Sequence, residues 1–128
     1  MRNKIKILVI LLLSSVVLFS CAKEKIRNTD SKGKNIICFG DSITAGYGVN
    51  KEEAYPYLLE KMFNFPVINA GLDGDTTVEA LKRLSNDVLE KDPYLVIIEL
   101  GGNDFLTRVP LEVTLHNIEK IIQRIQDK

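Results

Sequence analysis

Residues 36–49 read Ile-Ile-Cys-Phe-Gly-Asp-Ser-Ile-Thr-Ala-Gly-Tyr-Gly-Val, and this stretch decides the fold. Four apolar residues, 36–39, run directly into Gly-Asp-Ser. This is the pattern of a strand buried on both faces that ends in a small polar turn. In open α/β sheets, ligands bind beyond the carboxyl ends of the strands. The pattern therefore places Ser42 where a nucleophile could meet a substrate.

Strand-like and helix-like segments alternate along the rest of the chain. We expect strands at 36–39, 66–70 and 95–100, and helices at 54–62, 76–90 and 111–125. This alternation predicts right-handed crossovers and a parallel sheet, and hence an α/β fold. Three strands make a thin sheet, and no strand follows the last helix. We therefore expect an incomplete domain whose last strands are missing.

Two local patterns make sharper predictions about the first two long helices. Ala54, Leu58 and Met62 recur at intervals of four, which predicts one buried stripe on the first helix. Thr76 and Glu79 fit a capping box, in which each side chain satisfies an N–H group at the start of the second helix.

Composition indicates one globular domain. The 128 residues carry a formal net charge of +0, with 45% hydrophobic and 27% charged residues. The neutral balance gives no reason to expect nucleic acid as a partner. No metal-ligand spacing or nucleotide fingerprint is present, so we expect neither a metal nor a cofactor. Cys38 is expected to be a small buried residue of the first strand, and no feature defines an oligomeric state.

Residues 1–20 are expected to be a lipoprotein signal peptide. Three basic residues lie within the first six positions, and the apolar run at 7–19 is too short to span a bilayer comfortably. Residues 18–21, Leu-Phe-Ser-Cys, resemble the bacterial lipobox, which implies a lipid on Cys21 and a place in the bacterial cell envelope, held to the membrane. The alternative is an uncleaved anchor with an incidental cysteine. Polar residues 21–34 are expected to form a flexible tether.

The three predicted strand ends offer the parts of a nucleophilic site. A serine hydroxyl is a weak nucleophile that needs a base and donors for the oxyanion formed at an attacked carbonyl. Ser42 supplies a hydroxyl, and its own N–H, the N–H of Gly74 and the side-chain amide of Asn103 are candidate donors. Gly74 has no Cβ, so its backbone can approach an oxyanion closely. Each motif alone is a common turn, but together they indicate one site.

At these residues the chain resembles the SGNH, or GDSL, hydrolase family, and most nearly its bacterial thioesterase, lysophospholipase and arylesterase branch. The matching blocks are residues 39–48, 67–77 and 99–104, in the family's order and spacing, so the resemblance covers about 35–128. It implies a flavodoxin-like three-layer α/β/α sandwich. It also implies a serine esterase that hydrolyses small acyl esters or thioesters.

By the same resemblance, Ser42 is the nucleophile, and Gly74 and Asn103 complete the oxyanion hole. The family carries its base in an Asp-x-x-His motif, which this sequence lacks. Its single histidine, His116, has Val113 three positions before it and is expected on a helix surface. We therefore assign no catalytic aspartate or histidine within the chain. Two hypotheses stay open: an esterase whose sequence is cut short, and an inactive remnant or ligand-binding lipoprotein.

Overall fold

The computed structural model describes residues 29–128. The predicted signal peptide at 1–20 and the predicted lipidation site Cys21 lie outside the described residues, as does most of the predicted tether at 21–34. In its described part, the Ser31 hydroxyl donates to the Pro93 carbonyl at 3.1 Å. The Lys34 N–H donates to the Asp92 carbonyl at 2.9 Å. This part of the predicted tether therefore lies against the beginning of the third strand.

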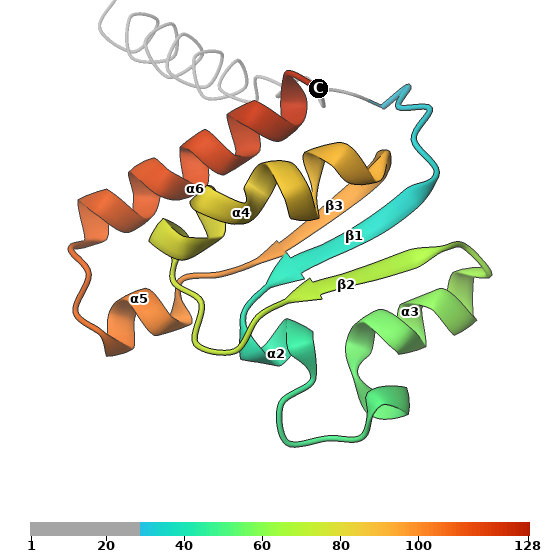
Figure 1. Ribbon diagram of the computed structural model, residues 1–128, viewed down its shortest axis with the longest axis horizontal. Coiled ribbons are helices and arrows are strands. Elements are labelled where there is room, and N and C mark those ends of the chain that lie inside the picture. The colour runs from blue at the N-terminus through green and yellow to red at the C-terminus, as the bar shows by residue number, and fades with distance from the viewer. Residues whose placement is uncertain (1–28) are drawn as a thin grey trace, which may run out of the picture.

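A three-stranded parallel sheet forms the centre of the molecule, with strand order β2-β1-β3. The strands are β1 (Asn35–Gly40), β2 (Val67–Gly71) and β3 (Pro93–Glu99). All three strands were predicted, with bounds that differ by one to two residues. Figure 1 shows the three arrows pointing the same way, with β1 between the other two. Because β1 is central, Ile37, Cys38 and Phe39 are fully buried.

Helices cover both faces of this sheet (Figure 1). They are α2 (Ser42–Ala45), α3 (Tyr55–Phe63), α4 (Thr77–Asp87), α5 (Gly102–Leu106) and α6 (Leu111–Gln126), with 3₁₀ turns η1 (Lys51–Glu53) and η2 (Leu89–Lys91). The core joins one sheet face to α4 and α6 through Ile37, Phe39, Ala80, Leu84, Val88 and Ile121. On the other face, α3 contacts β2. The predicted α/β fold with a parallel sheet is confirmed, and the short helices α2 and α5 were not predicted.

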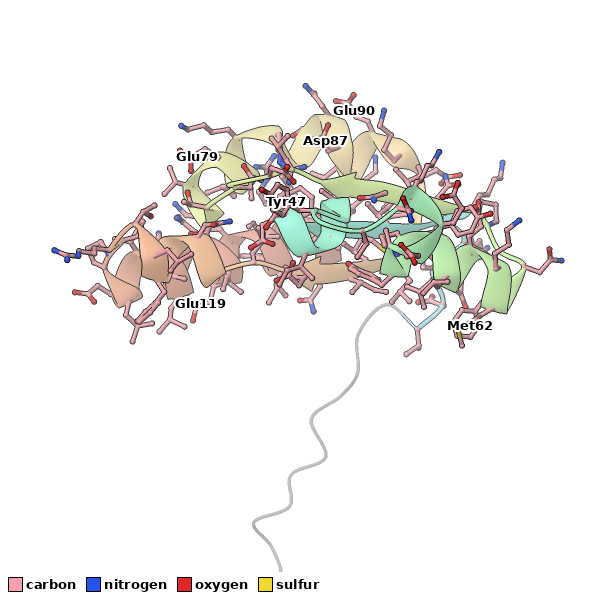
Figure 2. All side chains as sticks on the ribbon, turned by 90° about the horizontal axis from the view of Figure 1, so that it is seen from below. Tyr47, Met62, Glu79, Asp87, Glu90 and Glu119 are labelled. Carbon is pink, nitrogen blue, oxygen red and sulfur yellow. The ribbon has the colours of Figure 1, made fainter. Side chains whose placement is uncertain are left out.

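The predicted buried stripe of α3 is wrong beyond its first residue. Ala54 is buried, but Leu58 and Met62 are 47% and 75% exposed. Figure 2 shows Met62 at the outer end of α3, pointing away from the sheet. Pro56 is buried at the beginning of α3, where the Tyr55 hydroxyl lies 3.0 Å from the Thr44 hydroxyl, and Leu59 is half-buried. The i, i+4 spacing defines a helix face but does not show what covers it.

The predicted capping box of α4 is only partly correct. Thr76 is the N-cap, but its hydroxyl bonds the Glu79 carboxylate and makes no bond to the backbone of the first turn. The Thr77 N–H instead donates to the Asp104 carboxylate of α5 at 2.8 Å. The cap therefore comes from a distant segment, which a local sequence pattern cannot reveal.

The free side of β3 exposes apolar side chains. Tyr94 and Leu95 of β3 are about half exposed, as is Leu115 of α6. A groove of about 720 Å³ runs along β3 and α6, with Gly33 and Pro93 in its lining. This groove lies toward the amino end of β3. Its lining extends along β3 to Ile98 and includes none of the predicted site residues Ser42, Gly74 and Asn103.

Candidate active site

Ser42 lies at the carboxyl end of the central strand, as predicted. β1 ends at Gly40, and Ser42 is the first residue of α2. The Asp41 carboxylate caps α2 by accepting the Ile43 N–H at 3.0 Å. The helix ends at Gly46, whose backbone is left-handed with φ 92°. Ser42 is half-buried between these two ends and keeps a face toward solvent.

Glycines at two strand ends let α2 sit directly on the sheet. A Cβ at Gly71, the last residue of β2, would overlap the backbone of Thr44 and Ala45 in α2. A Cβ at Gly40 would overlap Thr44 and the Glu99 carbonyl of β3. Only glycine leaves this space free, so the position of α2, and with it Ser42, depends on both residues.

Gly74 lies in a tight turn between β2 and α4. The Asp75 N–H donates to the Leu72 carbonyl at 3.2 Å, and Gly74 adopts φ 76°, which favours glycine. No atom lies within 4 Å of where its Cβ would be. Among the described residues, no group accepts the Gly74 N–H. That N–H is therefore available to a ligand in open space.

Asn103 links the segment of Ser42 to the segment of Gly74. Its side-chain amide donates to the Asp75 carbonyl at 2.9 Å and to the Asp41 carboxylate at 3.3 Å. Asp75 follows Gly74, and Asp41 precedes Ser42, so the three predicted site residues are brought to one edge of the sheet. Donation to an oxyanion would require the amide to exchange its longer bond, the one to Asp41. The roles of Ser42, Gly74 and Asn103 stay predictions.

An acidic pair, the buried Asp41 and the half-buried Glu99, lies behind α2 and was not predicted. Asp41 is 3% exposed, and burial raises the pKa of the Glu99 carboxyl. The Asp41 carboxyl raises that pKa further through a hydrogen bond and charge repulsion. The Thr44 hydroxyl donates to the Glu99 carboxylate at 3.2 Å. Tyr55, whose hydroxyl lies beside that of Thr44, is also partly buried, and this burial raises its pKa to about 12. The available signal was Glu99 itself, the one charged residue in an apolar strand.

Asp104, the residue next to Asn103, belongs to the scaffold. It is 1% exposed and accepts the Thr77 hydroxyl at 2.5 Å and the Thr114 hydroxyl at 3.1 Å, besides the Thr77 N–H. Asn117 of α6 donates to the Thr77 hydroxyl at 3.1 Å. These bonds tie α4, α5 and α6 together. In the Gly-Gly-Asn-Asp motif, Asp104 therefore holds the helices together, whereas the neighbouring Asn103 lies at the candidate site.

Cys38 and His116 are not part of the candidate site. Cys38 is buried in β1, and burial raises the pKa of its thiol, which suits the predicted packing role. His116, the single histidine, lies exposed on α6. Within residues 29–128, no group of His, Cys, Asp and Glu side chains could hold a metal ion. No helix in that range is long and apolar enough to cross a membrane.

Comparison with known proteins defines the class. The model of the GDSL-like lipase/acylhydrolase family matches residues 38–128, and the chain belongs to this family. The resemblance seen in the sequence is therefore confirmed. The match begins within β1 and includes the three strand ends that carry Ser42, Gly74 and Asn103.

Individual relatives are esterases and a lipoprotein. An arylesterase of Vibrio mimicus is 37% identical over 120 residues, which cover 90% of this chain and 58% of that protein. AlinE4, an SGNH-hydrolase family esterase of known structure, is 39% identical with a TM-score of 0.68, covering 75% of this chain and 55% of that chain. The uncharacterized lipoprotein YqeF of Bacillus subtilis is 32% identical over 78 residues, covering 56% and 32%. The chain thus spans little more than half the length of the two esterases.

The acidic pair predicts a pH-dependent stability. Since the folded pKa of Glu99 is raised above 4.5, the folded protein holds a proton that the unfolded chain releases above about that pH. Stability should therefore fall as the pH rises from 4.5 through the raised pKa. We expect Glu99→Gln, measured by urea unfolding between pH 4 and 8, to reduce this fall.

Glu119→Gln is the control, because Glu119 is an exposed glutamate of α6. It should keep the pH profile of the wild type. Parallel profiles for the wild type and Glu99→Gln would contradict a raised pKa of the Glu99 carboxyl. Comparison within one set of variants also cancels the contribution of Asp75, whose pKa burial raises as well.

Proposed function

We propose that this chain carries the nucleophile and the oxyanion donors of a serine acyl hydrolase. The observation that supports this most directly is the Asn103 amide, which bonds both Asp41 beside Ser42 and Asp75 beside Gly74. A nucleophile, a free backbone N–H and a neutral side-chain donor thereby converge from three strand ends. This is the arrangement that acyl transfer requires.

In the proposed reaction, the Ser42 hydroxyl oxygen attacks the carbonyl carbon of a small acyl ester or thioester while a base takes its proton. The N–H groups of Ser42 and Gly74 and the Asn103 amide stabilise the resulting oxyanion. Collapse of this intermediate releases the alcohol or thiol, and water then hydrolyses the acyl-serine. His116 lies exposed on α6 and is not assigned as the base, and we assign no catalytic aspartate or histidine among the residues of this chain.

The surroundings of Ser42 favour an apolar substrate group. Ile43, Tyr47, Leu72 and Phe105, on the segments that follow the three strands, are each more than half exposed. Figure 2 shows Tyr47 beside α2, on the surface. Such side chains suit an acyl chain or an aryl ring. An aryl ester, a lysophospholipid and an acyl thioester are therefore the substrates to test.

The alternative is an inactive remnant or a ligand-binding lipoprotein. The described residues place no histidine beside Ser42, and the exposed apolar side chains could hold an ester without cleaving it. Triad-type enzymes lose several orders of magnitude in rate when one member is removed. An acyl hydrolase and a ligand-binding remnant therefore differ clearly in the rate at which they hydrolyse an ester, and less in how well they bind it.

Replacing the nucleophile separates the two functions. Ser42→Ala should abolish hydrolysis of p-nitrophenyl acetate and of lysophosphatidylcholine. The free energy of unfolding should stay within about 0.5 kcal/mol, because Ser42 is half-buried and Asp41 supplies the cap of α2. Undiminished hydrolysis in this variant would refute the nucleophile. Ester binding by both proteins with turnover by neither would favour the ligand-binding alternative.

Removing the side-chain donor tests the oxyanion hole. Asn103→Ala should lower kcat by roughly 10²–10³-fold, equivalent to about 2.7–4 kcal/mol of transition-state stabilisation, with a smaller change in KM. Steady-state kinetics on the aryl ester measures both constants. The control is Asn50→Ala, in the exposed cap of η1. A change confined to KM would instead assign Asn103 to substrate binding.

We further propose that the protein is a lipoprotein of the bacterial cell envelope, anchored by lipid on Cys21. The lipobox-like residues 18–21 support this, together with the similarity to YqeF, which is named a lipoprotein. Cys21→Ser should abolish incorporation of labelled palmitate and release the protein from the membrane fraction. Cys38→Ser, at the buried cysteine, is the control and should keep the label. Equal labelling of both variants would exclude Cys21 as the acceptor.

A further inference from the structure

Arg83, on α4, places a guanidinium group beneath the carboxyl ends of β1 and β2. Its side chain is 15% exposed and lies over the Phe39 ring at 4.4 Å. Nε donates to the Asp75 carboxylate at 2.7 Å, and Nη2 donates to the Gly40 carbonyl at 3.0 Å. Nη1 donates to the Ala70 carbonyl and to the Asp87 carboxylate, each at 2.9 Å. One side chain therefore binds four acceptors on three segments.

Three of these four acceptors lie next to the candidate site. Gly40 ends β1 two residues before Ser42. Ala70 lies near the end of β2, where the chain turns toward Gly74. Asp75 follows Gly74, and its carbonyl accepts the Asn103 amide at 2.9 Å. The guanidinium is thus connected through Gly40, Ala70 and Asp75 to Ser42, Gly74 and Asn103, and its hydrogen bonds end on these intermediate residues and on Asp87.

Arginine suits this position for a geometric reason. Its planar guanidinium offers five N–H donors in fixed directions, whereas a lysine ammonium offers three donors at one point. A lysine ammonium would have to serve the Gly40 and Ala70 carbonyls and the Asp75 carboxylate from one point, without the fixed directions of the guanidinium donors. Asp75 is 1% exposed at its side chain, so it also needs a charged partner to stay ionised inside the protein.

We propose that Arg83 is a positioning residue for the hydrolysis proposed above: by clamping the ends of β1 and β2 to Asp75, it sets the distance between Ser42 and the donors Gly74 and Asn103. The Arg83 clamp, meaning Arg83 with Gly40, Ala70 and Asp75, acts through these residues and makes no contact with substrate. Misplacement of a donor by about 1 Å can lower the rate roughly 10²-fold.

The first test is Arg83→Lys, with Arg124→Lys as its matched control. Arg124 carries the same side chain on α6 and donates to the exposed Ser85 hydroxyl at 2.8 Å, outside the clamp. With the aryl ester, we expect Arg83→Lys to lower kcat roughly 10²-fold with KM within about threefold. Arg124→Lys should match the wild type. A second variant, Arg83→Ala, should partly recover when guanidinium ion is added at millimolar concentration.

The second test needs no turnover and keeps the two proposals separate. The Asn103 side-chain NH₂ and the Gly74 N–H give distinct signals in a ¹⁵N-correlated NMR spectrum. Both should shift in Arg83→Lys and stay unchanged in Arg124→Lys. Unchanged signals in a folded Arg83→Lys, or a loss of kcat equal to that of Arg124→Lys, would overturn the clamp. If Ser42→Ala left hydrolysis unchanged, the proposed function would be overturned. The NMR comparison of Arg83→Lys with Arg124→Lys would still test the Arg83 clamp, because it does not depend on hydrolysis.

Discussion

The buried carboxylate of Asp104 is the interaction on which the arrangement of the helices depends. A charge that is 1% exposed is costly unless donors replace its water, and Asp104 finds them in Thr77 and Thr114. One of these donors is a backbone N–H at the start of α4, where the helix dipole also favours a negative charge. The bonds tie α5 to both α4 and α6. Asn103 is the neighbour of Asp104 on α5. The contacts of Asp104 therefore also position the Asn103 amide at the candidate site.

Two features shape the candidate site: glycines that make room for neighbouring backbone, and buried polar side chains behind α2. Gly40 and Gly71 admit α2 onto the strand ends, and Gly74 keeps an N–H open to solvent. Behind α2, Asp41 and Glu99 place two carboxyl groups close together, an arrangement that core packing alone would avoid. The region around Ser42 therefore holds one pair of carboxyl groups that lowers the stability of the fold at neutral pH. Apolar packing on the α4 and α6 face offsets this loss.

Much of the fold and part of the site could be predicted because their signals are local. Apolar runs that end in small polar turns define the three strands, and parallel topology then brings Ser42, Gly74 and Asn103 to one edge. The missed features depend on partners distant in sequence: Asp104 caps α4, and Glu99 meets Asp41. The predicted burial of Leu58 and Met62 is wrong for a related reason, because helical periodicity does not show which surface of a helix is covered. The roles of the three site residues stay predictions.

The central place of β1 has a consequence for the newly made chain. Synthesis delivers β1 first, yet Ile37 is flanked by Ile68 and Val96, so its second neighbour is made much later. Until then an apolar segment has one free edge and can associate with other chains. During this interval Ser42 has no Asn103 beside it, because Asn103 follows β3 in the chain. A growing polypeptide therefore presents Ser42 before the Asn103 amide can reach it, and the candidate site is complete only when β3 and α5 have docked.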